Sequence, residues 1–258
     1  MDSLLILLGF LVGTAVGLTG VGGGAIMTPL LIMFTDLKLA SIIAVDLIFA
    51  SVTKISATYT HAKNRNIDWF VLKRMWLGSI PTTLIVISIV FTKNIFSMEF
   101  VLPIIGIILV LSGILMGISH ESQSYARKLR LQFPEQFKIY QKHLTILGAS
   151  IIGGLVALTS IGAGAIGAIM LRALYPLRMI PKKLVGTDTI HAIPIALIAG
   201  IGYSSIGYLD TNTLFWLLLG SLPGSFIGAY LTNKIKPHWV KVFLGIAITF
   251  SGIKIAFF

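Results

Sequence analysis

The chain has 258 residues, of which 56% are hydrophobic and only 11% are charged. Soluble domains carry about 25% charged residues, so this composition excludes a soluble globular protein. The formal net charge is +11, but most basic residues lie in short segments between apolar runs, and no basic surface with interleaved aromatic residues indicates a nucleic-acid partner. Cysteine is absent, which excludes disulfides and thiolate metal sites.

Apolar runs of about 20 residues follow one another along the chain, and each is long enough to cross a hydrocarbon core of roughly 30 Å. We therefore predict an all-α polytopic membrane protein built from two repeats, residues 1–118 and 146–258. Each repeat is a helical hairpin broken by glycine, followed by three transmembrane helices. The first repeat has its hairpin at 4–35 and its spans at 39–60, 70–92 and 99–118. The second has its hairpin at 146–171 and its spans at 184–203, 213–232 and 239–257.

The two hairpins contain related glycine-rich segments, Gly17–Ile26 (GLTGVGGGAI) and Ala157–Ile166 (ALTSIGAGAI). Glycine inside a spanning run should unwind the helix, because it loses the most conformational freedom when it is fixed there. Within a membrane, unwound backbone is tolerated only where protein or a water-filled cavity covers it. Paired broken segments in two halves are typical of the binding site of a secondary transporter.

The duplication extends beyond the glycines, because acidic residues, glycines and prolines keep their register. The equivalent pairs are Asp46 with Asp188, Asp68 with Asp210, and Leu77–Pro81 with Leu219–Pro223. The polar segment 119–145 separates the repeats, and we expect it to be a cytoplasmic linker that lies partly on the membrane surface.

The basic residues predict that the two repeats are inverted. The first repeat is basic around the end of its first span, at Lys63, Arg65, Lys73 and Arg74, whereas the equivalent segment 204–210 has no basic residue. The second repeat is basic at 172–183, where the first has only Lys38 with Asp36. Because basic loops face the cytoplasm, equivalent loops lie on opposite sides of the membrane, which requires an odd number of crossings per repeat. We therefore expect five helices per repeat, with both termini outside. If each broken segment crossed only once, the repeats would instead be parallel.

With these motifs the chain resembles the TauE/SafE sulfite exporter family. The residues that carry the resemblance are Gly17–Gly24 with Pro29, Val185–His191 and Gly220–Gly224. The second glycine motif departs from the family pattern, since Ser160 and Ala163 stand where glycines are common. The resemblance implies a permease for small sulfur-containing anions, such as sulfite or an organosulfonate, in the plasma (inner) membrane of a prokaryote.

The glycine-rich segments are the candidate anion site. Backbone N–H groups at the start of a half-helix, together with the helix dipole, bind anions. The alternative is that the glycines only allow close helix packing. The candidate substrate-binding residues are Thr19, Gly22, Gly23, Gly24, Thr159, Gly162 and Gly164.

Candidate coupling residues lie in the spans that follow the hairpins. An intramembrane carboxylate is costly and functional by default, so Asp46 and Asp188 are candidates for coupling anion movement to protons, with His191 one turn after Asp188. The alternative is that each carboxylate accepts hydrogen bonds from its broken hairpin. Lys54 either extends to the membrane surface or serves as a counter-charge for the anion.

Two further pairs recur in the repeats, one of prolines and one of acids. Pro81 and Pro223 predict either a gating hinge or a static kink in equivalent spans. Asp68 and Asp210 stand where helices begin, which predicts helix capping.

The leading functional prediction is a secondary active carrier with no cofactor and no bound metal. No P-loop pattern is present. The alternatives are an anion channel or a carrier of a different small organic anion. An intramembrane enzyme is the least favoured, because the five histidines are scattered and form no metal or nucleophile motif. The expected partners are the anion, the lipid bilayer and, if the aspartates couple, H⁺.

Overall fold

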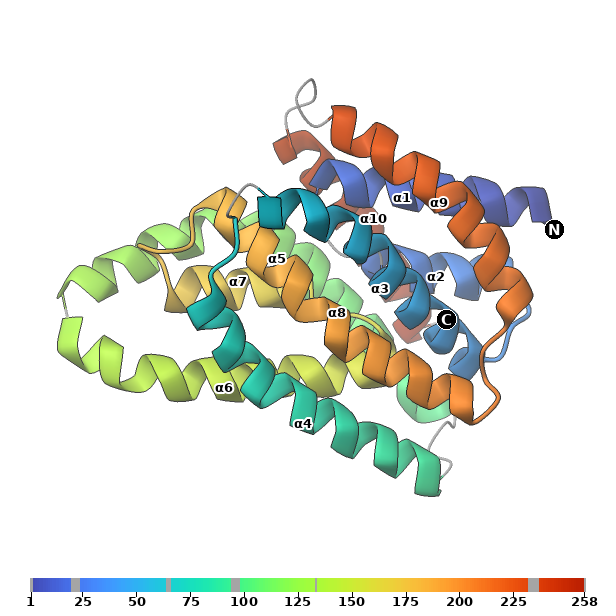
Figure 1. Ribbon diagram of the computed structural model, residues 1–258, viewed down its shortest axis with the longest axis horizontal. Helices are drawn as coiled ribbons and strands as arrows, with labels where there is room; N and C mark the ends of the chain where they lie inside the picture. Colours follow the sequence, from blue (N-terminus) through green and yellow to red (C-terminus); the bar gives the residue numbers. More distant parts are fainter. Residues whose placement is uncertain are drawn as a thin grey trace.

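The computed structural model describes the backbone of residues 2–19, 24–63, 66–93, 98–132, 134–231 and 237–257. These ranges are helices and short connections, without a strand in any of them. In chain order the helices are α1 (Asp2–Thr19), α2 (Gly24–Phe34), α3 (Leu39–Lys63), α4 (Trp69–Lys93), α5 (Met98–Gln132), α6 (Pro134–Thr159), α7 (Ala165–Leu174), α8 (Pro181–Ser205), α9 (Thr211–Leu231) and α10 (Pro237–Phe257) (Figure 1).

Three helices within the described ranges are long and apolar enough to cross a membrane: Trp69–Thr92, Lys138–Thr159 and Pro181–Ser205. Five shorter apolar helical stretches, of 10–17 residues, are also described, and they include α2 and α7 of the broken hairpins. Large apolar side chains cover much of the outer surface; for example, Phe226 is 70% exposed and Phe250 is 71% exposed. Such a surface is stable in lipid and would aggregate in water.

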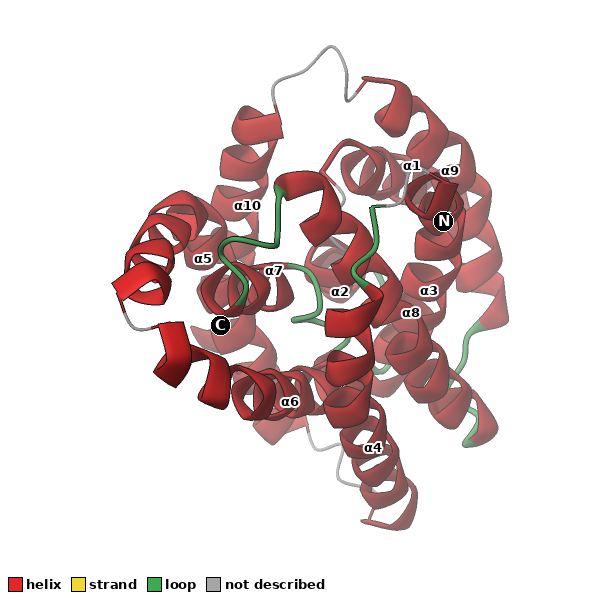
Figure 2. Ribbon diagram, turned by 60° about the vertical axis from the view of Figure 1, so that its left-hand side comes forward, coloured by secondary structure: helices red, strands yellow, loops and turns green. Residues whose placement is uncertain are grey.

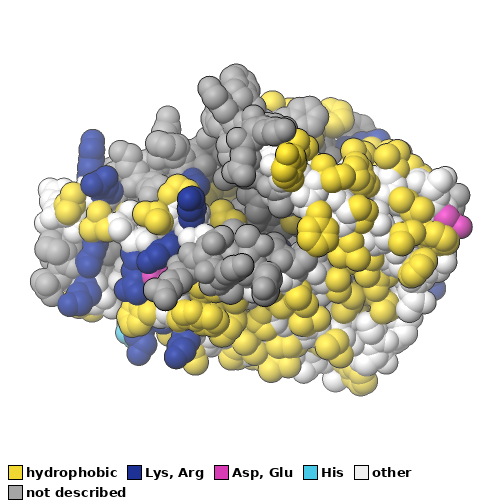
Figure 3. Space-filling model, turned by 45° about the horizontal axis from the view of Figure 1, so that its top comes forward, with side chains coloured by type: hydrophobic (Ala, Val, Ile, Leu, Met, Phe, Trp, Pro, Cys, Tyr) yellow, Lys and Arg dark blue, Asp and Glu magenta, His cyan; other side chains and the backbone are white. Residues whose placement is uncertain are grey.

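The segment predicted as a linker is helical in its described residues. Helix α5 runs on to Gln132 and α6 begins at Pro134, so residues 119–145 belong to these helices except for residue 133, which lies outside the described residues. In Figure 1 this pair projects from the left of the helical body. Exposed basic side chains gather at the same end (Figure 3), among them Lys73, Arg127, Lys128, Lys138, Lys142 and Lys182.

Helices from the two halves pack in corresponding pairs. Helix α1 lies along α9, and α6 lies along α4; α3 packs on α8, and α5 on α10 (Figures 1 and 2). Glycine makes the first two contacts close. A Cβ atom on Gly13 of α1 would overlap the backbone of Ser221, and one on Gly153 of α6 would overlap the backbone of Ser79. Ser79 and Ser221 are equivalent in the repeat, so the same close contact occurs twice.

The second glycine-rich segment breaks its helix where the sequence predicts. Helix α6 ends at Thr159 and α7 begins at Ala165. Between them, Ser160 has φ +60° and Gly162 has φ +119°. Residues other than glycine rarely adopt the second value. The corresponding residues 20–23, between α1 and α2, lie outside the described residues.

Asp68 and Asp210 cap helices, as predicted. The Val71 amide donates to Asp68 Oδ1 at 3.3 Å, and the Thr213 amide donates to Asp210 Oδ1 at 2.7 Å. Asp68 has a second role, because the guanidinium of Arg178 donates to both of its oxygens. This ion pair joins the start of α4 to the connection between α7 and α8, at the basic end of the molecule.

Candidate functional site

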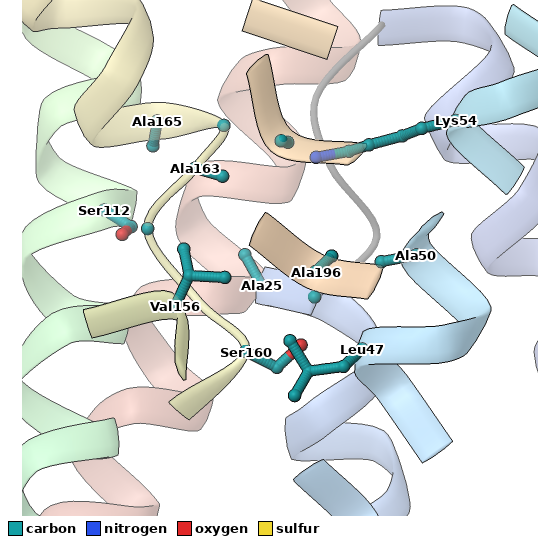
Figure 4. A pocket seen from close by; sticks show the side chains of 14 residues that line it. Ala25, Leu47, Ala50, Lys54, Ser112, Val156, Ser160, Ala163, Ala165 and Ala196 are labelled. Carbon is teal, nitrogen blue, oxygen red and sulfur yellow. The ribbon is translucent and has the colours of Figure 1, made fainter. Parts of the chain in front are cut away.

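A small cavity lies where the two broken hairpins meet α3, α5 and α8 (Figure 4). Its walls are mostly glycine and alanine from both halves, including Gly24, Ala50, Gly164 and Ala192. Its volume is about 20 Å³, which is room for roughly one water molecule. The cavity is therefore closed to anything larger than water in this conformation.

Two half-helices begin at the cavity wall. Gly24 is the first residue of α2, and Gly164 directly precedes α7; both line the cavity. The first N–H groups of a helix have no partner within it, and the helix dipole places roughly half a positive charge there. No side chain caps the start of α7. A Cβ atom on Gly24 would overlap the Ser160 carbonyl oxygen, so the two broken segments are in direct contact.

Lys54 is the charged residue of the cavity lining. Its side chain extends from α3 into the cavity (Figure 4) and is only 5% exposed. The environment therefore differs from that of a lysine that reaches the membrane surface. The ammonium makes no ion pair within 4.0 Å in the part of the chain that the structure describes. Its charge acts on the buried carboxylates of Asp46 and Asp188.

Each predicted aspartate lies against the start of a half-helix. The Thr28 hydroxyl of α2 donates to Asp46 Oδ2, and this carboxylate also lies beside Gly24. Asp188 Oδ1 packs directly against Gly167, in the first turn of α7. Both side chains are buried, and Oδ1 of each has no hydrogen-bond partner among the described residues. The helix N-termini favour negative charge at these two positions.

Thr159, the threonine of the second glycine motif, does not line the cavity. Thr159 is fully buried, but its hydroxyl donates to Leu155 O at 2.7 Å and accepts from the Ile161 amide at 3.2 Å. It therefore stabilises the end of α6 and does not line the cavity. Thr19 ends α1, and its side chain lies outside the description, as do Gly22 and Gly23 entirely. Gly162 does line the cavity.

His191 faces α4, away from the cavity. Its Nε2 lies 3.0 Å from Ser79 Oγ, and its carbonyl accepts a hydrogen bond from Trp76 Nε1 at 3.4 Å. The side chain is fully buried, and Nδ1 has no partner in the described ranges. Pro81 and Pro223 are exposed on the outer faces of α4 and α9, so neither touches the cavity.

Ser112 is a cavity residue that the sequence did not single out. It lies on α5, is fully buried and lines the cavity, and its hydroxyl has no hydrogen-bond partner among the described residues. A buried hydroxyl normally has a partner, so this one is available to a ligand. A serine inside an apolar span gives little warning of such a role. Nowhere in the described ranges do three His, Asp or Glu side chains form a group that could hold a metal ion.

Comparison with known proteins places the chain among membrane transporters. A family model described as "Sulfite exporter TauE/SafE" matches residues 5–255. A "Probable membrane transporter protein YjnA" of Bacillus subtilis is 34% identical, over 99% of this chain and 100% of its own length. A second B. subtilis protein, YdhB, is 25% identical over 98% of this chain, and MJ0441 of Methanocaldococcus jannaschii is 27% identical over 97%; both carry the same description. No solved structure matches.

Proposed function

Because this chain belongs to the TauE/SafE sulfite exporter family, we propose that it is a secondary active transporter of a small sulfur-containing anion, such as sulfite or an organosulfonate. The observation that carries the proposal is the cavity at which two half-helices begin beside a buried lysine. Half-helix N-termini and an ammonium group both attract an anion. The free hydroxyl of Ser112 adds a hydrogen-bond donor at the same place.

The arrangement of helices supports a repeat of five helices, and the distribution of basic residues favours its inverted form. Exchanging α1–α5 with α6–α10 converts the pair α1–α9 into α6–α4, and the pair α5–α7 into α10–α2, and all four pairs are in contact. The basic end of the molecule (Figure 3), toward which α5 and α6 project (Figure 1), is the cytoplasmic side in this proposal. Five helices per repeat then place both termini outside the plasma membrane.

A closed cavity favours a carrier over a channel. An anion larger than water enters only if the broken segments, which touch at Gly24 and Ser160, move apart. Alternating access achieves this when one repeat rocks against the other around a fixed site. A channel would instead hold a continuous path through the same conformation.

Asp46 and Asp188 are the coupling groups of this proposal. A charged side chain near the bilayer centre costs about 3 kcal/mol of insertion free energy. Two buried carboxylates at equivalent positions therefore favour a functional role for both. They lie beside the helix starts that would hold the anion. An ionised carboxylate repels the anion, so protonation and anion binding favour each other.

Counterflow in proteoliposomes tests the proposed function. Vesicles that contain the purified protein are loaded with unlabelled sulfite and diluted into labelled sulfite, with organosulfonates as competitors. A carrier gives transient accumulation of label, and the order of competition ranks the substrates. Flux without accumulation would indicate a channel. No uptake of sulfite or of any organosulfonate by folded protein would contradict the assignment to sulfur-containing anions.

A further inference from the structure

The buried charges around the cavity are one ammonium and two carboxylates. Lys54 is 5% exposed, Asp188 is 4% exposed and Asp46 is fully buried. Charges in a medium of low dielectric constant are stable only when they are balanced. An anion that enters this cavity therefore adds a charge that must be compensated by the side chains already present.

The repeat supplies only one cation to the cavity. Lys54 follows Asp46 by eight residues, and the residue that follows Asp188 by eight is Ala196. Both Lys54 and Ala196 line the cavity, so an ammonium on one side faces a methyl group on the other. The site is therefore suited to a compact ligand with one negative charge, and a second charge would find no cation on the Ala196 side.

The two aspartates differ in what holds them. Asp46 accepts a hydrogen bond from Thr28. No side-chain donor to Asp188 is present in the described part of the chain, and its Oδ1 is buried without a partner. The buried cation of this region is Lys54, which lines the cavity. Asp188 is therefore the carboxylate whose charge depends most on the lysine.

We propose that the transported anion replaces Asp188 as the counterion of Lys54, and that Asp188 then takes up one proton from water. This inference rests on the proposed function and gives it a charge class and a coupling ratio. Before binding, Lys54 is positive and Asp188 is negative, and Asp46 keeps the same protonation state throughout. After binding, Lys54 is positive, the anion is negative and Asp188 is neutral. The charge of the site is unchanged, so one proton accompanies each singly charged anion and transport is electroneutral.

Beyond these three side chains, His191 is the buried titratable group that the charge of Lys54 reaches. Helix α2 has no titratable side chain, and His191 on α8 points to Ser79 of α4. The buried Tyr203 hydroxyl of α8 donates to Ala157 O. The basic side chains on α4, α6, α7 and α8 are exposed or half-buried, namely Lys73, Arg74, Lys138, Lys142, His143, Arg172, Lys182 and Lys183.

Proton uptake on binding tests the exchange directly. The full-length protein in lipid nanodiscs is titrated calorimetrically with methanesulfonate, an anion that stays singly charged and brings no proton. Titrations in buffers of different ionisation enthalpy, over a pH series, give the protons taken up for each anion bound. We expect a maximum of about one proton per anion in the wild type. Asp188→Asn should bind without uptake, whereas the matched variant Asp210→Asn, at an aspartate that caps α9 and does not line the cavity, should retain uptake.

The outcomes separate this inference from the proposed function. If the wild type binds methanesulfonate without proton uptake, the exchange of Asp188 for the anion is overturned, and the proposal of an anion carrier remains. Undiminished proton uptake by Asp188→Asn overturns the role of Asp188. Sulfite binding without methanesulfonate binding overturns the charge class. Absence of binding by both anions overturns the proposed function itself. A second measurement needs no variant: methanesulfonate uptake into proteoliposomes should respond to a pH gradient and not to a potassium diffusion potential, and a response to the potential alone would contradict electroneutral coupling.

Discussion

The contact between the two broken segments predicts a specific cost for Gly24→Ala. The added methyl group would overlap the carbonyl oxygen of Ser160 and lie 3.2 Å from Asp46 Oδ2. A backbone oxygen cannot rotate away as a flexible side chain can, so the segments must separate. Overpacking of this kind costs about 1–3 kcal/mol. Gly24 also begins α2 at the cavity, so its displacement should weaken anion binding. Each 1.4 kcal/mol of binding free energy that is lost raises the dissociation constant about tenfold.

Gly154→Ala is the matched control, since it adds the same methyl group to a helix without an overlap. Its Cβ would lie 3.4 Å from Thr82 Cγ2 and 3.9 Å from Val86 Cγ2, which are ordinary contacts. Replacing glycine by alanine in a helix gains up to about 1 kcal/mol. The two variants should therefore differ by about 1–4 kcal/mol in mixed-micelle unfolding titrations. Equal free energies of unfolding for the two variants, with unchanged anion affinity for Gly24→Ala, would refute the close approach of the two broken segments.

Two further predictions concern buried and half-buried polar contacts. Asp68→Asn keeps a capping oxygen and removes only the ion pair with Arg178, which is 51% exposed, so it should cost at most about 1 kcal/mol, whereas Asp68→Ala should cost about 1–3 kcal/mol. Asp210 caps α9 without an ion pair among the described residues, so Asp210→Asn should leave the free energy of unfolding nearly unchanged. Unfolding titrations check these three variants. Equal losses for the two Asp68 variants would contradict the division of the role of Asp68 into capping and ion pairing. Ser79→Ala removes the only partner that the described residues give the His191 ring and should lower the free energy of unfolding by about 1–3 kcal/mol, which the same titration measures; an unchanged value would mean that His191 has another partner.

The sequence predicted the elements whose cause is local. The break between α6 and α7 falls at the predicted glycines. Gly162 has φ +119°, a backbone conformation that glycine itself permits. The capping roles of Asp68 and Asp210 follow in the same way from a short polar side chain at a helix start. Apolar runs likewise predicted helices, because a run of this length has no alternative in lipid.

Contacts between distant segments could not be predicted in this way. The sequence placed Thr159 among the anion ligands, but its hydroxyl bonds to its own segment. It gave no reason to choose Ser112, because a serine in an apolar span becomes a candidate only when the cavity beside it is known. The direction of Lys54 was also open, since a lysine eight residues past Asp46 can extend outward or inward. Tertiary packing, which places glycine and alanine around its ammonium, decides this.

The measurement that tests the central claim most directly is sulfite counterflow by Lys54→Met beside Lys54→Arg and Lys73→Met. Two unit charges 4 Å apart at an effective dielectric constant of 20 attract by about 4 kcal/mol, which bounds the contribution of the Lys54 ammonium. The account predicts that Lys54→Met loses counterflow while remaining folded, that Lys54→Arg retains part of it, and that Lys73→Met, which removes an exposed charge from α4, is unaffected. Wild-type counterflow in Lys54→Met would contradict the placement of the anion in this cavity.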